Sequence, residues 1–216
     1  MLPTNLEPIE VRVIGCLIEK ELSTPDHYPL SLNALTSACN QSSNRDPVMT
    51  LDENTVSQAI DTLRRQGLLR SIQGIGSRVP KYEHQLAAAG DLTRAELAVV
   101  SVLMLRGPQT QAEVRTRAAR LMPDESATGL DTALEALVTR DPRPVVARLP
   151  RRPGQKESRY AHLLAGEIVD APGDTPIVAT ATGTDRISVL EERVQELGKE
   201  IADLRAQLGA FRKQFE

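Results

Sequence analysis

Hydrophobic residues near the start of the chain recur at the spacing of helices. In PIEVRVIGCLIEKEL, Ile9, Val13 and Leu17 are four residues apart and predict one face of a first helix. After the breaker-rich loop TPDHYPL, the stretch SLNALTSACNQ predicts a second helix, with Ser31 as its N-cap and Leu35 on its apolar face. The pattern therefore opens with two short amphipathic helices.

A third helix and a pair of strands follow. Asp52 is the predicted N-cap of the helix ENTVSQAIDTLRRQ, which Gly67 ends. The stretches LLRSIQ and RVPKYEH then predict two strands around the turn GIGS. Three helices followed by a β-hairpin is the order of a winged helix, a variant of the helix-turn-helix.

The same pattern then occurs a second time. LTRAELAVVSVLMLRG corresponds to the first helix, TQAEVRTRAARL to the second and GLDTALEALVTR to the third. VVARLPRRPGQKESRYAHL predicts a second hairpin, turned at Pro153 and Gly154. Such self-similarity indicates one structural unit used twice. The matched positions in the first helices are Glu10 with Glu96, Val13 with Val99, and Leu17 with Leu103.

The predicted fold class is mainly α, of the α+β type, with four parts. Two tandem winged-helix domains are expected at residues 1–88 and 89–165. Residues 166–185 are rich in Gly, Pro, Ala and Thr without periodicity, which is typical of a flexible linker. Residues 186–216 are expected to form a coiled-coil helix.

The coiled coil is predicted from apolar residues that step by three and four without a break. With β-branched residues at most a positions and Leu at most d positions, the pattern favours a parallel two-stranded coil. The alternative is a helix that packs on its own domains. The candidate dimerisation residues are Ile187, Leu190, Val194, Leu197, Ile201, Leu204, Leu208 and Phe211, and Phe215 continues the series.

Composition narrows the class of protein. The net charge is −3 and aromatic residues make up 2% of the chain, so aliphatic side chains must fill the core and the chain as a whole is not basic. No apolar run is long enough to span a membrane and no secretory signal begins the sequence, so a cytoplasmic protein is expected. Cys16 and Cys39 lack zinc-site spacing and are expected to be buried thiols.

Two Tyr-x-His units, KYEH and RYAH, end the two predicted hairpins. They contain two of the three tyrosines and two of the three histidines of the chain. Residues two apart on a strand share a face, so each Tyr is expected to close its hairpin over the core with a hydrogen-bonded His beside it. No nucleophile or acid recurs near both units, which favours a structural role for Tyr82, His84, Tyr160 and His162 over a split active site.

Three stretches, YPLSLNALTSACNQSSNRDPVM, GSRVPKYEH and PRRPGQKESRYAHL, resemble the YceH-like family of uncharacterised bacterial proteins. The resemblance covers roughly residues 5–164 and implies a tandem winged-helix fold. It implies no biochemical activity. The segment NQSSNR, residues 40–45, is part of the resemblance and carries no known role with it.

Winged helices commonly read DNA, so we examined the outward face of each third helix. In the first copy this face holds Asn54, Gln58, Asp61 and Arg65. Asn and Gln can pair with adenine and Arg with guanine, but a carboxylate faces the negative potential of the groove. The second copy presents three threonines and, in the position of Asp61, Glu135. The outward faces are therefore poor readers of bases.

The hairpins are more basic than the helices. Residues 62–82 contain five basic side chains and no acid, and residues 140–160 contain seven basic and two acidic side chains. Basic wings can hold phosphates, although a solvated hairpin that carries Arg for solubility has the same composition. The candidate nucleic-acid-binding residues are Asn54, Gln58, Arg65, Arg70, Arg78, Lys81, Arg148, Arg151, Arg152 and Lys156.

The leading hypothesis is a non-enzymatic, dimeric DNA-binding protein, with a regulatory role as one form of it and double-stranded DNA as the partner. The alternative is a protein-interaction module, as in acidic tandem winged-helix subunits of chromosome-organising complexes. The sequence lacks a phosphate-binding loop, a dinucleotide fingerprint, metal-ligand spacing and a nucleophile elbow, so no cofactor is expected.

Truncation after Gly166 is expected to leave both winged domains folded and monomeric, because the unbroken heptads lie beyond that point. Light scattering on the full-length and truncated proteins measures this. A full-length protein that is monomeric at micromolar concentration would contradict the coiled-coil prediction.

Overall fold

The structure is a computed structural model of the 216-residue chain. It describes residues 2–73, 79–151, 155 and 157–166, which belong to one compact unit spanning Met1–Pro172. Apart from Gly166, the predicted linker and the coiled-coil helix lie outside the described residues, as do Arg78, Arg152 and Lys156.

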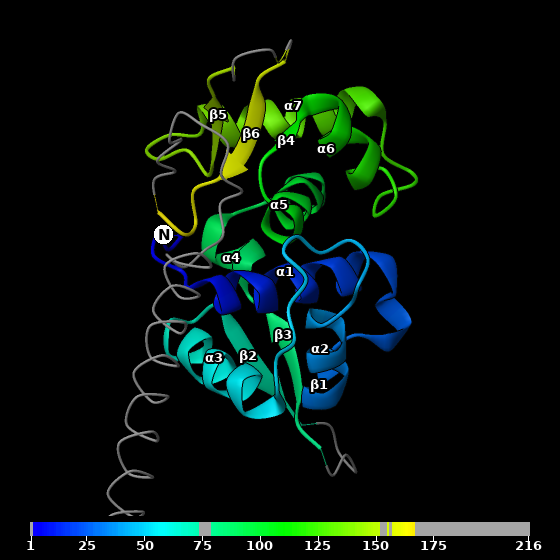
Figure 1. The fold of residues 1–216 in the computed structure, drawn as a ribbon, viewed down its shortest axis with the longest axis vertical. Helices are drawn as coiled ribbons and strands as arrows, with labels where there is room; N and C mark the ends of the chain where they lie inside the picture. The colour runs from blue at the N-terminus through cyan, green and yellow to red at the C-terminus, as the bar shows by residue number, and fades with distance from the viewer. Residues whose placement is uncertain (1, 74–78, 152–154, 156, 167–216) are drawn as a thin grey trace, which may run out of the picture. The chain divides into compact units, whose positions relative to one another are not determined.

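The described chain is a mixture of helices and small antiparallel sheets, coloured along the chain in Figure 1. Its described residues contain seven α-helices and two three-stranded sheets. The first half consists of α1 (Pro8–Ser23), β1 (Leu30–Ser31), α2 (Leu32–Cys39), α3 (Glu53–Arg65), β2 (Leu69–Ile72) and β3 (Lys81–His84). The second half consists of α5 (Arg94–Arg106), β4 (Gln109–Thr110), α6 (Gln111–Ala118), α7 (Ala127–Thr139), β5 (Val146–Leu149) and β6 (Arg159–His162).

Four short elements were not predicted from the sequence. The strands β1 and β4 are two residues long and each adds a third strand to its sheet, in the orders β1-β3-β2 and β4-β6-β5. The helix α4 (Leu86–Gly90) joins the two halves, and a single 3₁₀ turn (Pro25–His27) precedes β1. Elements this short bury too few residues to leave a periodic pattern in the sequence.

The predicted helix caps are present. The hydroxyl of Ser31 accepts a hydrogen bond from the N–H of Ala34 at 3.3 Å, and the carboxylate of Asp52 accepts one from Thr55 at 2.7 Å. Such side chains satisfy N–H groups that lack partners in the first helical turn. The sheets repeat the register as well as the order: Leu30 opposite Tyr82 in the first half corresponds to Gln109 opposite Tyr160 in the second.

The two halves share one hydrophobic core, centred on the contact between α1 and α5. Gly15 lies in this contact, where a Cβ atom would be 2.9 Å from Cδ2 of Leu105. A side chain at this position would therefore push the helices apart. The predicted burial of Cys16 and Cys39 is confirmed, since both thiols are fully buried and unbridged.

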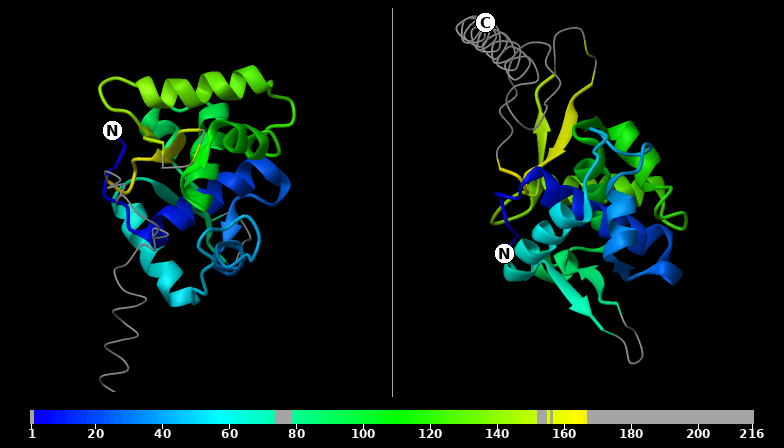
Figure 2. Two further views of the ribbon diagram at one scale, coloured as in Figure 1. Left: turned by 45° about the horizontal axis from the view of Figure 1, so that its top comes forward. Right: turned by 60° about the horizontal axis from the view of Figure 1, so that its bottom comes forward.

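The hairpins project away from this shared core in opposite directions. Figure 1 places β2 and β3 below α1, and β5 and β6 above α5. The right-hand view of Figure 2 again shows the two hairpins at opposite ends of the helices. The chain also crosses between halves near its start, where the N–H of Leu6 donates to the carbonyl of Leu164 at 2.9 Å.

The segment NQSSNR, residues 40–45, connects α1 and α2 through its buried Arg45, and we call this segment the strut. Arg45 is 5% exposed, and its Nη1 and Nη2 donate to the two carboxylate oxygens of Glu19 at 3.1 and 2.6 Å. Its Nε donates to the carbonyl of Ala38 at 3.1 Å, which satisfies an acceptor in the last turn of α2. A fork of two parallel hydrogen bonds fixes both position and orientation.

The strut and the residue that follows it, Asp46, also contact α5. The N–H of Asp46 donates to the carbonyl of Leu105 at 2.8 Å, and Nη1 of Arg106 donates to Oδ1 of Asn44 at 2.6 Å. Asn44 has a φ of 57°, a left-handed conformation that Asn tolerates better than most residues. At the start of the loop, the amide of Asn40 exchanges two hydrogen bonds of 2.7 Å with the backbone of Leu51. This segment thereby joins α1, α2 and α5.

Replacing Arg45 with Gln is expected to lower the free energy of unfolding by about 3 kcal/mol or more, because Glu19 loses its partner in a largely buried site. Arg64→Gln is the matched control. It breaks the exposed pair between Arg64 and Asp61 and is expected to cost at most about 1 kcal/mol. Urea denaturation followed by circular dichroism measures both, and equal midpoints would show that the strut does not stabilise the fold.

Candidate functional site

The outward face of α3 is arranged as the helical periodicity predicts. Asn54, Gln58, Asp61 and Arg65 are all exposed. Asp61 is not isolated, however, because its Oδ1 lies 3.4 Å from Nη1 of Arg64 one turn away. Both side chains are about half exposed or more, so water screens this pair and its effect is small. The face therefore carries mixed charge rather than an unopposed carboxylate.

A groove of about 570 Å³ runs between α3 and β2 and collects part of the predicted set. Arg64, Arg65 and Arg70 line it together with Asp61. Nε of Arg70 forms an ion pair with the carboxylate of Glu83, which lies directly opposite on β3. The expectation that the basic residues of the first hairpin are unopposed is therefore wrong for Arg70. The strand register, which the sequence does not state, brings the acid beside it.

A second hollow, of about 310 Å³, lies between α6 and the second hairpin. Three arginines face it: Arg115 from α6, Arg148 from β5, and Arg151 beyond the end of β5. Arg148 and Arg151 are exposed and form no ion pair with any described residue. Nη1 of Arg115 lies 3.0 Å from the carboxylate of Asp131 on α7. We call this set the second arginine group.

Sequence reasoning missed Arg115, because the charge count followed the hairpins and left out α6. The sequence carries no signal for it, because α6 is brought beside the hairpin by the pairing of β4 with β6. Of the remaining predicted residues, Lys81 is exposed on β3. Thr128, Thr132 and Glu135 are exposed on α7, as expected from periodicity.

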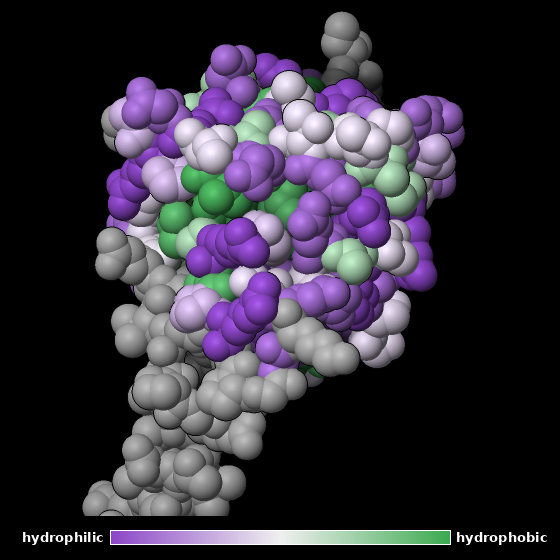
Figure 3. All heavy atoms as spheres, turned by 90° about the horizontal axis from the view of Figure 1, so that it is seen from above, coloured by the Kyte–Doolittle hydropathy of each residue, from purple (hydrophilic) through white to green (hydrophobic). Residues whose placement is uncertain are grey.

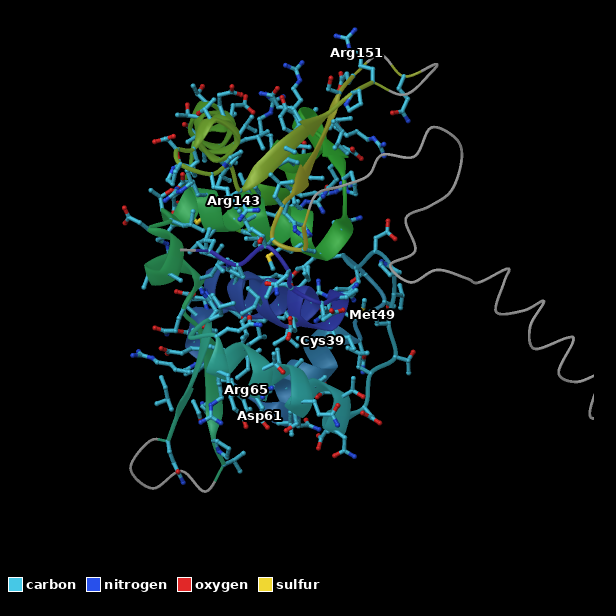
Figure 4. All side chains as sticks on the ribbon, turned by 90° about the vertical axis from the view of Figure 1, so that its left-hand side faces the viewer. Cys39, Met49, Asp61, Arg65, Arg143 and Arg151 are labelled. Atoms are coloured by element: carbon cyan, nitrogen blue, oxygen red, sulfur yellow. The ribbon has the colours of Figure 1, made fainter. Side chains whose placement is uncertain are left out.

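We call Arg64, Arg65 and Arg70, which line the groove beside α3, the first arginine group. The first and second arginine groups do not form one surface. In Figure 4, Asp61 and Arg65 lie on α3 in the lower part of the view, and Arg151 lies at the top, beside the other hairpin. The face of the second half seen in Figure 3 is mostly hydrophilic, with a small apolar area among the polar side chains. A partner that contacts one arginine group therefore leaves the other group free to contact a different segment.

The first Tyr-x-His unit is a structural corner. Nδ1 of His84 accepts a hydrogen bond from the N–H of Leu86 at 3.2 Å, and its Nε2 pairs with the carboxylate of Glu21. The hydroxyl of Tyr28 accepts a hydrogen bond from the N–H of His84 at 2.9 Å. The contact with His84 lowers the pKa of Glu21, and burial raises the pKa of Tyr28. Tyr82, half-buried, packs against the core.

The second unit differs from the first. Tyr160 is 6% exposed and belongs to the core, as predicted. The prediction of a hydrogen-bonded His is wrong here, because Nδ1 of His162 is buried without a hydrogen-bond partner among the described residues. Burial lowers the pKa of His162 to about 4. The two units thus share a backbone register but not a hydrogen-bond network.

Neither a metal centre nor a membrane span is found in the described part of the chain. No three His, Cys, Asp or Glu side chains there are grouped closely enough to hold a metal ion. No described helix has both the length and the apolar character needed to cross a bilayer. The arginine groups are therefore the most chemically distinctive exposed features among the described residues.

Comparison with known proteins supplies the family. Residues 6–155 match the model of the family described as "Protein of unknown function, DUF480". The chain belongs to the DUF480 family. This assignment agrees with the resemblance to YceH-like proteins seen in the sequence, and the match includes both arginine groups and the strut.

Individual relatives match along nearly their whole length. The UPF0502 protein PC1_1804 of Pectobacterium carotovorum is 47% identical over 211 residues, which cover 96% of this chain and 98% of the relative. A UPF0502 protein of Pelobacter propionicus is 49% identical over 219 residues, 98% of each chain. The UPF0502 protein GSU0233 of Geobacter sulfurreducens is 48% identical over 218 residues, again 98% of each. These names state no activity, so the function of this DUF480 chain must be argued from its geometry.

The stability of the DUF480 chain is expected to fall in acid partly through His162. An unfolded histidine has a pKa of about 6.5, so between that pH and about 4 the unfolded state binds a proton that the folded state excludes. The contribution is complete above about pH 6.5 and is lost as the pH falls toward 4. The parent is expected to lose about 2–3 kcal/mol more than His162→Gln over this range.

The measurement is urea denaturation of both proteins at pH 7 and pH 4.5. His27→Gln is the control, because His27 is exposed and its removal should leave the parent's pH dependence unchanged. Parallel pH curves for the parent and His162→Gln would show that His162 takes up its proton as readily in the folded state.

Proposed function

We propose that this DUF480 chain is a non-enzymatic, cytoplasmic tandem winged-helix protein that binds double-stranded DNA through its phosphates. The observation that carries the proposal is the repeated order of helix, strand, helix, helix and hairpin, with matching sheet orders in both halves. That order is the one found in winged-helix variants of the helix-turn-helix. In each half, arginines lie in a groove beside the hairpin.

The second arginine group is the stronger candidate for phosphate contact. Arg148 and Arg151 are exposed, and their guanidinium groups are not neutralised by an ion pair with a described residue. Guanidinium groups hold phosphates through two parallel hydrogen bonds, and each contact releases counterions from the duplex. In the first half, Arg70 is paired with Glu83 and Arg64 with Asp61, so we assign phosphate contact there to Arg65.

In this proposal the third helices contribute little to the reading of bases. Asp61 is exposed on α3 and Glu135 is exposed on α7, so each would-be recognition helix presents a carboxylate. Arg64 offsets part of the charge of Asp61, but no ion pair to Glu135 is found among the described residues. Binding is therefore proposed to depend on charge more than on sequence. Dimerisation through residues 186–216, and any role in transcription, belong to the same proposal.

A second candidate is a protein-interaction module of the kind found in chromosome-organising complexes. It is favoured by one observation: the ion pair between Arg70 and Glu83 removes a positive charge from the first hairpin, beside the exposed Asp61. A surface of mixed charge suits a protein partner better than a polyanion. The two candidates differ in their response to duplex DNA at low salt.

The double variant Arg148→Ala/Arg151→Ala is expected to weaken binding to all duplexes alike. It should also reduce the slope of log affinity against log salt by about one to two units, because each phosphate contact contributes close to one unit. Arg94→Ala/Arg143→Ala is the matched control. It removes the same charge from exposed arginines outside the groove, and its slope should equal that of the parent. Fluorescence anisotropy with random and genomic duplexes over a salt series measures both.

Three outcomes separate the alternatives. If no duplex binds even at low salt, the protein-interaction module replaces DNA binding. If Gln58→Ala abolishes binding to one sequence and spares random DNA, α3 reads bases and the minor part assigned to it is wrong. If Asp61→Asn and Glu135→Gln each tighten non-specific binding, the carboxylates face the duplex as proposed.

A further inference from the structure

We propose that a small cavity, formed where the NQSSNR strut meets α5 and α6, binds a phosphate-sized oxyanion. This inference does not rest on DNA binding, and none of its arginines belongs to the phosphate contacts proposed above. The cavity is lined by Glu19, Asn44, Ser101, Val102, Leu105, Arg106, Arg117, Arg120 and Leu121. It therefore takes side chains from α1, from the strut, and from α5, α6 and the residues that follow them.

The size of the cavity suits a small anion. Its volume is about 60 Å³. A single buried water needs about 10–15 Å³ on the same measure, so several waters or one polyatomic anion can fit. The hydroxyl of the fully buried Ser101 lies in the wall and donates to the carbonyl of Ala98 at 3.0 Å, which leaves its oxygen as a polar surface. Val102, Leu105 and Leu121 supply apolar parts of the wall, so the arginines and Ser101 provide the polar partners that an occupant of this cavity needs.

Three arginines line this cavity, and two of their guanidinium groups are held by other side chains. Nη1 of Arg117 donates to the side-chain oxygen Oε1 of Gln109, which is 3% exposed, and its Nη2 lies 3.3 Å from the carboxylate of Glu113. Arg106 is held by Oδ1 of Asn44 at 2.6 Å. Each guanidinium has five N–H donors, so these contacts leave others to face a ligand. Donors positioned before binding lose little freedom when the ligand arrives.

The third guanidinium belongs to Arg120, which is exposed and forms no ion pair with a described residue. With Arg106 and Arg117 it brings the number of arginines in the lining to three. An exposed arginine can close over a bound anion without disturbing the core. This makes Arg120 the most informative residue to change.

The charge around the cavity is unbalanced. Glu19 is the one carboxylate in the lining, and both of its oxygens are already bound by Arg45. The pKa of Arg106 is lowered, first by burial and then by the positive charges of Arg117 and Arg120, which outweigh the opposite effects of Asp46 and Glu113. An oxyanion in the cavity would offset this repulsion.

The chemistry of the donors selects the class of ligand. Planar guanidinium forks match the oxygen spacing of phosphate and carboxylate groups, and they bind such anions through paired hydrogen bonds. Three forks around one volume suit a tetrahedral phosphate better than a planar carboxylate, which offers fewer acceptor directions. The ligand is either free phosphate or the phosphoryl group of a larger metabolite, and both share this chemistry.

Binding at this place would also affect how the halves are joined. Asn44 and Glu19 belong to the first half, and the three arginines belong to the second. A ligand that binds the arginines and the strut together stabilises the contact between α1 and α5. The folded state is then favoured in proportion to the logarithm of ligand concentration.

The test uses the full-length chain in chloride buffer, to which sodium phosphate is added at constant ionic strength. Thermal unfolding and isothermal calorimetry are expected to show saturable binding with a rise in Tm. Arg120→Gln should weaken phosphate affinity about tenfold or more, because a charge-assisted hydrogen bond contributes about 1.5–3 kcal/mol. Arg106→Gln is a second variant with the same expected direction.

Arg143→Gln is the control, since it removes an exposed arginine outside this cavity and should bind phosphate like the parent. A nucleoside monophosphate at the same concentration separates the two sources: equal binding identifies a phosphoryl group on a larger molecule, and weaker binding identifies free phosphate. The proposal is overturned if phosphate has no saturable effect, or if Arg120→Gln and Arg143→Gln bind it equally. No DNA is present, so either result is independent of the proposed DNA binding.

Discussion

The close contact between α1 and α5 is the constraint on which the rest of this structure depends. Gly15 allows it, because any side chain there would collide with Leu105. With these helices packed together, both halves share one apolar core, and their hairpins are left on opposite sides. A helix contact made of aliphatic side chains has little directional preference. The strut fixes how the two helices are oriented, because Arg45 and Asn44 form hydrogen bonds with α1, α2 and α5.

The arginines of this chain have different roles, which depend on how deeply each is buried and on which residue lies opposite it. Arg45 is buried against Glu19 and serves the fold. Arg70 is paired across the sheet with Glu83, which offsets part of its charge. Arg148 and Arg151 remain exposed beside a hollow, while Arg106 belongs to a cluster around a small cavity. Counting arginines along the sequence treats all of these as equivalent, and only their surroundings distinguish them.

The two halves share the same backbone arrangement but not the same side-chain interactions. Both copies pair the same positions of their sheets, so Tyr82 and Tyr160 occupy equivalent places. Around them the chemistry differs. His84 is held by Leu86 and Glu21, while Nδ1 of His162 lacks a hydrogen-bond partner among the described residues. A duplicated backbone therefore leaves each copy free to acquire its own surface and its own pH response.

The sequence by itself determined the helices, their caps and the repeat, because helical periodicity and capping depend on residues close together in the chain. Ser31 and Asp52 are examples, and the outward face of α3 also followed from its period. It also indicated the basic hairpins, but not which arginines stay unpaired. The tertiary structure alone decided that Arg70 meets Glu83, that Arg115 joins the second arginine group, and that NQSSNR is a strut. Each depends on residues brought together by strand register or by the packing of α1 on α5, and neither leaves a local signal in the sequence.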